Sequence, residues 1–464
     1  MTQDVIAFDG FDIQIDLDRW PAKILRALLR RHYEKHELRL VARLLKPGDR
    51  VIELGCAIGV VALAAARIAA PGSITCFDAN PDMVAKARDN FSLNGQAIAA
   101  HNAVLVAADD TRAEATFYKT PYFLSSSLQP RTADSLPIAV PTANLEQTIA
   151  DAGANVLIVD IEGGEFELLG SADLSGIEKL ILELHVSMAD VGSCMDLIAH
   201  LAQQGLHLDA NLSAHNVFVF IANRPVDTAD IHKSAFAQDY LTALERSDAG
   251  DRSAAINALR RALGENPSNA HAHLLLSQLL STDGALEAAR ASAERSFRLD
   301  PANEDTLEQL GVLHSACGNP GKAQTAYTQA IGLVPHRPLF HAGLGAVCAR
   351  QGQLDEALAE LRTAAALNPP RANTLAQVLA LASRQDKFAG DDAPRTSATP
   401  PDGIDKQQFL SGLAAIVQRS FRFADAASSL EWALKLAPDD SALHCGLAMQ
   451  VATPKDVRRA LETL

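Results

Sequence analysis

Four prolines in the second half of the chain recur at a constant interval of 34 residues. They are Pro267, Pro301, Pro335 and Pro369. An alanine stands at the same distance before each of them, namely Ala255, Ala289, Ala323 and Ala357. A period of this length in a helical pattern predicts repeats of two paired helices, with the alanines where the helices touch. One repeat cannot bury its own apolar face, so the repeats must stack into an array with a concave groove.

This half of the chain resembles a tetratricopeptide (TPR) array, which we place at 235–464. A further unit ends at Pro438, after a polar, proline-rich stretch at about 386–403 that predicts a flexible insertion. The positions of the inner groove lack the lysine and asparagine clamp that some TPR modules use for a peptide carboxylate. The resemblance therefore implies a general protein-binding surface, or a surface that forms a homo-oligomer.

Composition limits the function classes. The 464 residues are 48% hydrophobic and 21% charged, as in ordinary globular proteins of two to four domains. The net charge of −15 works against nucleic acid as a partner. The six cysteines form no C-x-x-C pair, which favours a reducing cytoplasm. We expect no secretory leader and no membrane span.

The first half alternates short β-branched runs with helical patterns, which predicts a doubly wound α/β sheet over 50–223. Residues 1–49 are expected to form a helical lead-in, and 224–234 a linker to the repeats. Strands are predicted at 50–54, 73–77, 98–104, 155–160, 179–185, 206–209 and 216–222. The region 114–145 is less regular and is interpreted as a lid or a substrate wall.

A strand-to-helix turn carries the first functional pattern. Glu53 ends the first strand, the turn runs from Gly55 to Gly59, and the next strand leads to Asp78. Glycines let the backbone approach a ligand, and a carboxylate after the second strand accepts ribose hydroxyls, as at a dinucleotide site. S-adenosylmethionine (SAM) is favoured instead, because Glu53 suits a cationic cofactor, the loop holds no basic residue, and the last two strands predict an antiparallel edge hairpin.

Several spaced motifs resemble those of FkbM-type methyltransferases. They are ELGCAIG from Glu53, FDANP from Phe77, NAV from Asn102, SSL from Ser126, VDIEGGE from Val159 and ELH from Glu183. The resemblance implies a class I methyltransferase fold and SAM-dependent O-methylation of sugar hydroxyls. Two positions depart from the family pattern, since Glu53 replaces the usual Asp and Ala57 the usual Asn.

The cofactor residues follow from this resemblance. It implies Glu53 near the methionine amino group, Asp78 at the ribose hydroxyls, and Asn80 and Ala103 beside the ribose and adenine. It also implies that the cofactor approaches the backbone of the loop at Gly55, Cys56 and Gly59.

The acceptor is expected at the ends of two later strands. Asp160, Glu162, Glu165, Glu183 and His185 stand there, where open α/β sheets bind ligands. A positioned base contributes about 10²–10⁴-fold to such a transfer. His185 and Asp160 are the candidate bases and Glu162 a further catalytic residue, whereas Glu162 and Glu165 also suit a helix N-terminus. A divalent cation held by the carboxylates is the alternative, and no metal ligand set is assigned.

The leading hypothesis is a cytoplasmic SAM-dependent O-methyltransferase that modifies a sugar hydroxyl of a glycan, glycolipid or glycosylated metabolite. In this hypothesis the TPR array recruits a partner or the acceptor. One alternative is a protein or peptide methyltransferase whose acceptor binds in the TPR groove. Another is a scaffold with an inactive methyltransferase-like domain.

Overall fold

The computed structural model describes residues 4–367 apart from gaps at 16–19, 21–23, 25–26, 29–32, 71, 121–127, 129, 131–134, 187–188 and 223–229. These residues form two compact units, divided within the helical region between Leu279 and Leu280, with residues 16–33 in the second unit. Predictions for 368–464, including the insertion at 386–403 and the unit ending at Pro438, lie outside the described residues. The linker at 224–234 stays a prediction.

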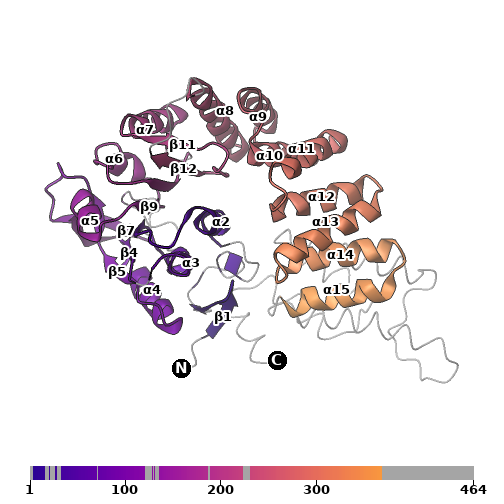
Figure 1. Cartoon of the computed structure of the whole chain (residues 1–464), viewed down its shortest axis with the longest axis horizontal. Helices are drawn as coiled ribbons and strands as arrows, with labels where there is room; N and C mark the ends of the chain where they lie inside the picture. The colour runs from indigo at the N-terminus through magenta and orange to yellow at the C-terminus, as the bar shows by residue number, and fades with distance from the viewer. Residues whose placement is uncertain are drawn as a thin grey trace. The chain divides into compact units, whose positions relative to one another are not determined.

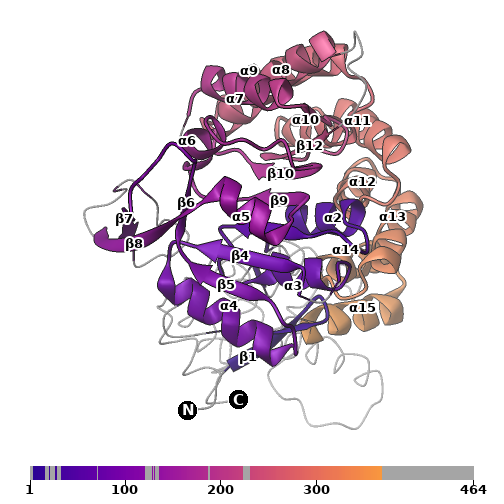
Figure 2. The same ribbon diagram turned by 60° about the vertical axis from the view of Figure 1, so that its left-hand side comes forward.

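A seven-stranded sheet forms the centre of the first unit. Its order is β11-β12-β10-β9-β3-β4-β5, and β10, β9, β4 and β5 can be followed across it in Figure 2. The strands are β3 (Val51–Leu54), β4 (Ile74–Asp78), β5 (Ala99–Asn102), β9 (Val156–Val159), β10 (Lys179–Glu183), β11 (Leu206–Leu208) and β12 (Val217–Ala222). Strands β5, β4, β3, β9 and β10 are parallel, and β12 runs antiparallel between β10 and β11. The predicted α/β sheet with an antiparallel edge hairpin is confirmed.

Helices follow the strands as the alternating pattern predicts. They are α2 (Lys35–Leu44), α3 (Val60–Ala66), α4 (Pro81–Leu93), α5 (Leu145–Ala152), α6 (Glu165–Leu169) and α7 (Val191–Gln203). The start of α4 shows the local cause, because Pro81 occupies the first turn and the Asn80 side chain accepts a hydrogen bond from the Asp82 amide. This cap fixes the backbone directly after Asp78.

A second, three-stranded sheet corrects two of our expectations. The strand predicted at 98–104 is split, since β5 stays in the large sheet and β6 (Val104–Val106) joins β8 (Leu136–Asn144) and β7 (Glu114–Lys119). The described parts of 114–145 are therefore mainly strand. The small core of this second sheet contains Val104, Phe117 and Val140, which explains why the chain leaves the large sheet after β5.

The N-terminus also differs from the helical lead-in predicted for 1–49. Strands β1 (Asp4–Phe8) and β2 (Phe11–Ile15) form an antiparallel hairpin ahead of α2. Asp9 and Gly10 both have positive φ in its turn. An Asp-Gly pair between apolar runs is a strong hairpin pattern, so the sequence carried the information.

Paired helices make up the rest of the described chain. They are α8 (Asp230–Asp248), α9 (Arg252–Glu265), α10 (Ala270–Thr282), α11 (Leu286–Leu299), α12 (Glu304–Ala316), α13 (Pro320–Leu333), α14 (Pro338–Arg350) and α15 (Leu354–Ala366). In the second unit, α12 to α15 lie side by side (Figure 1). Tyr327 is buried there, and a Cβ on Gly311 or Gly343 would lie 2.6 or 2.4 Å from its ring, so both neighbours must be glycine. No helix among the described residues is long and apolar enough to cross a membrane.

Candidate functional site

The site lies at the edge where the parallel strands β3, β4, β9 and β10 end. The turn after β3 passes close to the end of β9, and a Cβ on Gly55 would lie 1.6 Å from the Asp160 carbonyl oxygen. Gly55 also has a φ of +87°, which favours glycine. Glycine at this position therefore brings the cofactor loop and the β9 end together.

Asp78 is fixed by the backbone around it. Its two carboxylate oxygens accept hydrogen bonds from the Ala57 amide at 2.8 Å and the Asn80 amide at 2.7 Å. Burial raises the pKa of Asp78 to about 6, although both of these bonds lower it. Asp78 therefore connects the turn after β3 to the start of α4.

A cavity of about 670 Å³ opens at this edge. Its lining includes four of the predicted cofactor residues, Gly55, Asp78, Asn80 and Ala103, and two of the predicted catalytic residues, Asp160 and Glu162. The volume is in the range of small-molecule sites. The two predicted groups thus share one cavity.

The remaining wall comes from the three-stranded sheet and from α6. It includes Arg112, Thr116 and Tyr118, which no sequence motif assigned to the site. The alternating burial of β7 would have indicated a strand here, but not which cavity the strand lines. Residues 114–118 line the cavity, and their interpretation as a lid or a substrate wall stays a prediction. Ser126 and Ser127 of the SSL motif fall in a gap of the described residues.

Three predicted cofactor residues are not among the residues that line the cavity in the described part of the chain. Glu53 is 4% exposed, and its Oε2 has no hydrogen-bond partner among the described residues. Burial, followed by the charge of Asp78, raises the pKa of Glu53 to about 8. Cys56 is buried with its thiol hydrogen-bonded to Cys76, and a Cβ on Gly59 would lie 2.4 Å from the Phe91 ring. Cys56 and Gly59 therefore have packing roles.

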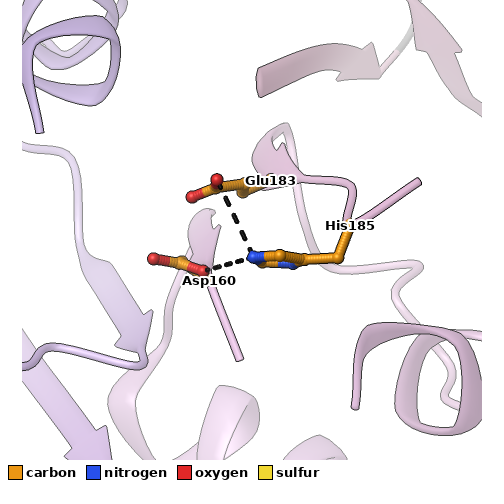
Figure 3. Close-up of side chains that lie close together, drawn as sticks. All are labelled: Asp160, Glu183 and His185. Atoms are coloured by element: carbon orange, nitrogen blue, oxygen red, sulfur yellow. Dashed lines mark ion pairs between the residues drawn. The ribbon is translucent and has the colours of Figure 1, made fainter. Parts of the chain in front are cut away.

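His185 gathers carboxylates from two strand ends (Figure 3). Its Nε2 lies 3.6 Å from Asp160, 3.5 Å from Glu162 and 3.8 Å from Glu183. Burial, followed by the charge of Glu183, raises the pKa of Asp160 well above its ordinary range. The sequence placed these residues at the ends of two strands and left the direction of Glu183 open, and the structure brings Asp160, Glu162 and Glu183 close to His185. His185 itself is not among the lining residues.

Glu165 holds the opposite side of the imidazole. Its side chain is completely buried, and Oε1 lies 3.2 Å from His185 Nδ1 and accepts the His185 amide at 3.1 Å. Its Oε2 accepts the Gly163 amide at 2.7 Å. Burial lowers the pKa of His185, but the Glu165 hydrogen bond and the Glu183 charge outweigh it, so the pKa is raised. Glu165 is more than a helix N-terminal residue.

Two family comparisons bear on this geometry. Residues 35–117 match the ribosomal protein L11 methyltransferase (PrmA) family, and residues 240–304 and 309–372 match a tetratricopeptide repeat family. The chain thus has a PrmA-like methyltransferase region, which implies SAM, and TPR repeats. The first match contains Gly55, Asp78 and Ala103 but ends before Asp160. The FkbM-type assignment stays a prediction.

Two solved structures are similar to part of the chain. The crystal structure of MamA is 18% identical, covers 40% of this chain and 94% of its own, and has a TM-score of 0.29. YrrB, described as a TPR protein with an unusual peptide-binding site, is 17% identical, covers 47% and 97%, and has a TM-score of 0.31. No curated protein sequence matches this chain significantly.

Proposed function

We propose that the chain is a SAM-dependent O-methyltransferase whose acceptor is a sugar hydroxyl of a glycan, glycolipid or glycosylated metabolite. One observation carries the proposal. A single cavity is lined by Gly55 of the loop after β3, by Asp78 at the end of β4, and by the acidic residues Asp160 and Glu162. A cofactor and an acceptor that share this cavity would meet between the two groups.

The residues present fit SAM as the cofactor. The loop from Gly55 to Gly59 carries no basic side chain that would bind a phosphate. Asp78 lines the cavity as a candidate partner of the ribose hydroxyls. The Oε2 of Glu53 has no hydrogen-bond partner among the described residues, and the pKa of about 8 keeps this carboxyl neutral until a cationic ligand favours its ionised form. When bound, SAM supplies an electrophilic methyl group.

The chain's own contribution is alignment and proton removal. Alignment of the acceptor supplies much of the acceleration in a displacement of this kind. A sugar hydroxyl must also lose its proton, and the nearby candidate acceptors are Asp160, Glu162 and the His185 imidazole. Glu165 fixes the direction of the imidazole, because one of its oxygens binds both Nδ1 and the backbone amide of His185.

The charge of the cavity favours an uncharged or cationic acceptor. Eight of the described lining residues are acidic, and Arg112 is the basic one among them. Arg112 itself pairs with Asp110 and, at 3.1 Å, with Glu167. A phosphorylated acceptor would be repelled. A neutral polyol would find many hydrogen-bond acceptors, and the TPR repeats would recruit the acceptor or a protein partner.

A protein acceptor is the second candidate. The matched family is named for methylation of a ribosomal protein, and an acidic cavity also suits a cationic side chain. In this case the TPR groove would hold the acceptor chain. An inactive scaffold is the remaining alternative.

Both enzyme candidates require that the chain binds SAM. Calorimetry with the full chain and SAM tests this, and we expect one binding site. Mass spectrometry after incubation with labelled SAM then separates the acceptors. Label in a glycan extract supports the sugar proposal, whereas label confined to protein supports the second candidate. Absence of SAM binding by folded protein would refute both.

A further inference from the structure

We propose that Asp160, Glu183 and His185 bind a divalent metal cation. One ligand atom of each residue lies within 4.8 Å of the others, and Figure 3 shows the two carboxylates directed toward the same imidazole nitrogen. Ligand atoms that share a cation at about 2.1 Å lie up to about 4.2 Å apart. Around a tetrahedral ion the ligand atoms lie about 3.4 Å apart, so a contraction of up to about 1.4 Å would close the site.

The orientation of His185 is the first argument. Glu165 Oε1 accepts a hydrogen bond from the His185 amide, so it is an acceptor toward Nδ1 as well, and Nδ1 carries a proton. In the neutral imidazole this leaves the lone pair on Nε2, which is directed at the other carboxylates. Metal-binding histidines usually donate their second ring N–H to a carboxylate in this way. Glu165 is completely buried and stands outside the proposed ligand set.

The unsatisfied carboxylate is the second argument. Asp160 Oδ1 is inaccessible to solvent and has no hydrogen-bond partner among the residues that the structure describes. It is the atom that lies 3.6 Å from His185 Nε2. The Asp160 side chain as a whole is 28% exposed, but its inaccessible Oδ1 lacks a donor that would offset its desolvation. A cation between Asp160 and Nε2 would satisfy both atoms.

The surrounding charge is the third argument. Glu162 Oε2 lies 3.5 Å from the same Nε2, and the charges of Glu34 and Glu37 also act on Asp160. An excess of negative charge around one imidazole favours a divalent cation over a monovalent one. The mixed set of one nitrogen and two oxygen ligands suits Mn²⁺, Fe²⁺ or Zn²⁺ better than an all-oxygen site would.

The role of the cation rests on the proposed function. Asp160 lines the cavity, so an ion bound there would reach an acceptor hydroxyl and lower its pKa. Binding of the ion itself does not depend on the methyl transfer. The two ideas can therefore fail separately.

Titration of the full chain with Mn²⁺, followed by electron paramagnetic resonance and calorimetry, tests the site. We expect one bound Mn²⁺ with a nitrogen hyperfine coupling. Asp160→Asn and Glu183→Gln should each weaken binding at least 10-fold, and His185→Gln should remove the nitrogen coupling. Glu165→Gln should weaken binding about 10-fold, as removal of an outer partner does.

Asp196→Asn, an exposed change on α7, is the matched control and should bind like the wild type. Circular dichroism shows whether each variant is folded. Failure of Mn²⁺, Zn²⁺ and Mg²⁺ to bind folded wild type that still binds SAM would overturn the metal site alone. Equal binding by all variants would also overturn it. Metal binding without SAM binding would instead refute the proposed function.

Discussion

Two groups of carboxylates stand at the same sheet edge in different surroundings. On the cofactor side, Asp78 is held by two backbone amides and Glu53 is buried beneath the loop. On the acceptor side, Asp160 and Glu183 converge on His185. Burial is the largest cause of the raised pKa in both groups. A neighbouring carboxylate adds to it for Glu53 and for Asp160, whereas two backbone amides lower the pKa of Asp78. In the proposed function, the first group binds the cofactor and the second acts on the acceptor.

The largest expected effect is a loss of turnover on substitution of His185, with SAM binding left almost unchanged. His185→Ala should lower turnover about 10²–10⁴-fold, because it removes either the base or a ligand of the metal. The dissociation constant for SAM should change less than about twofold, since His185 does not line the cavity. Steady-state kinetics and calorimetry measure the two quantities. Full turnover by folded His185→Ala, with Asp196→Asn as the control, would remove the acceptor side from the mechanism.

On the cofactor side, we expect a substitution to weaken SAM binding. Asp78→Ala should weaken SAM binding about 10–100-fold, because hydrogen bonds to a charged group contribute about 1.5–3 kcal/mol. Asp82→Asn, at the exposed start of the next helix, is the control and should bind normally. Calorimetry at one pH compares the variants. If both variants bind SAM as the wild type does, Asp78 is only a connector between the turn and α4.

The pH dependence of SAM binding isolates Glu53. With a pKa of about 8, Glu53 is protonated in the free protein at neutral pH. A cationic ligand favours the ionised form, so binding must release a proton. The dissociation constant should therefore fall as pH rises from 6 to 8, by up to about tenfold per pH unit, and level off above 8.

Glu53→Gln should flatten this profile above pH 7, where Asp78, with a pKa of about 6, is mostly ionised. Calorimetry in buffers of different ionisation enthalpy counts the released proton. A steep profile that persists in Glu53→Gln would assign the titration to another group.

The cofactor side and the acceptor side of the site also differ in how much of their structure could be predicted from the sequence. The segment from Gly55 to Asp78 is continuous in the sequence and contains the loop, α3 and β4. Its residues, together with those of β3, are therefore enough to predict its strand–loop–helix–strand order. Asp160 and His185 were both predicted at the carboxyl ends of strands, and the structure shows that these two strands are adjacent. The role of Glu165 could not be decided from the sequence. Only the folded structure shows that its Oε1 lies within hydrogen-bond distance of both the backbone amide and Nδ1 of His185.

The cavity wall from β7 could not be predicted in the same way. Alternation in β7 indicates a strand, but its pairing with β8 joins segments separated by a long connection. The N-terminal hairpin was a different kind of error, because its Asp9-Gly10 turn was visible in the sequence. The burial of Glu53 could not be predicted either. The side chain of a residue at a strand end can face the cavity or the protein interior, and the sequence does not show which.

The smallest expected effect tests Ala57, the departure from the family pattern on the cofactor side. Ala57 has a φ of +43°, a conformation that costs an ordinary residue about 1–2 kcal/mol and that glycine and asparagine adopt more readily. Its amide donates to Asp78 whatever the side chain is. Ala57→Gly and Ala57→Asn should therefore raise the free energy of unfolding by up to about 1 kcal/mol in urea titrations. Ala64→Gly, within α3, is the control of opposite sign and should lose about 1 kcal/mol. A loss of stability in both Ala57 variants would mean that the methyl group packs against the loop, and the alanine would then be an adaptation of this cofactor loop rather than a tolerated strain.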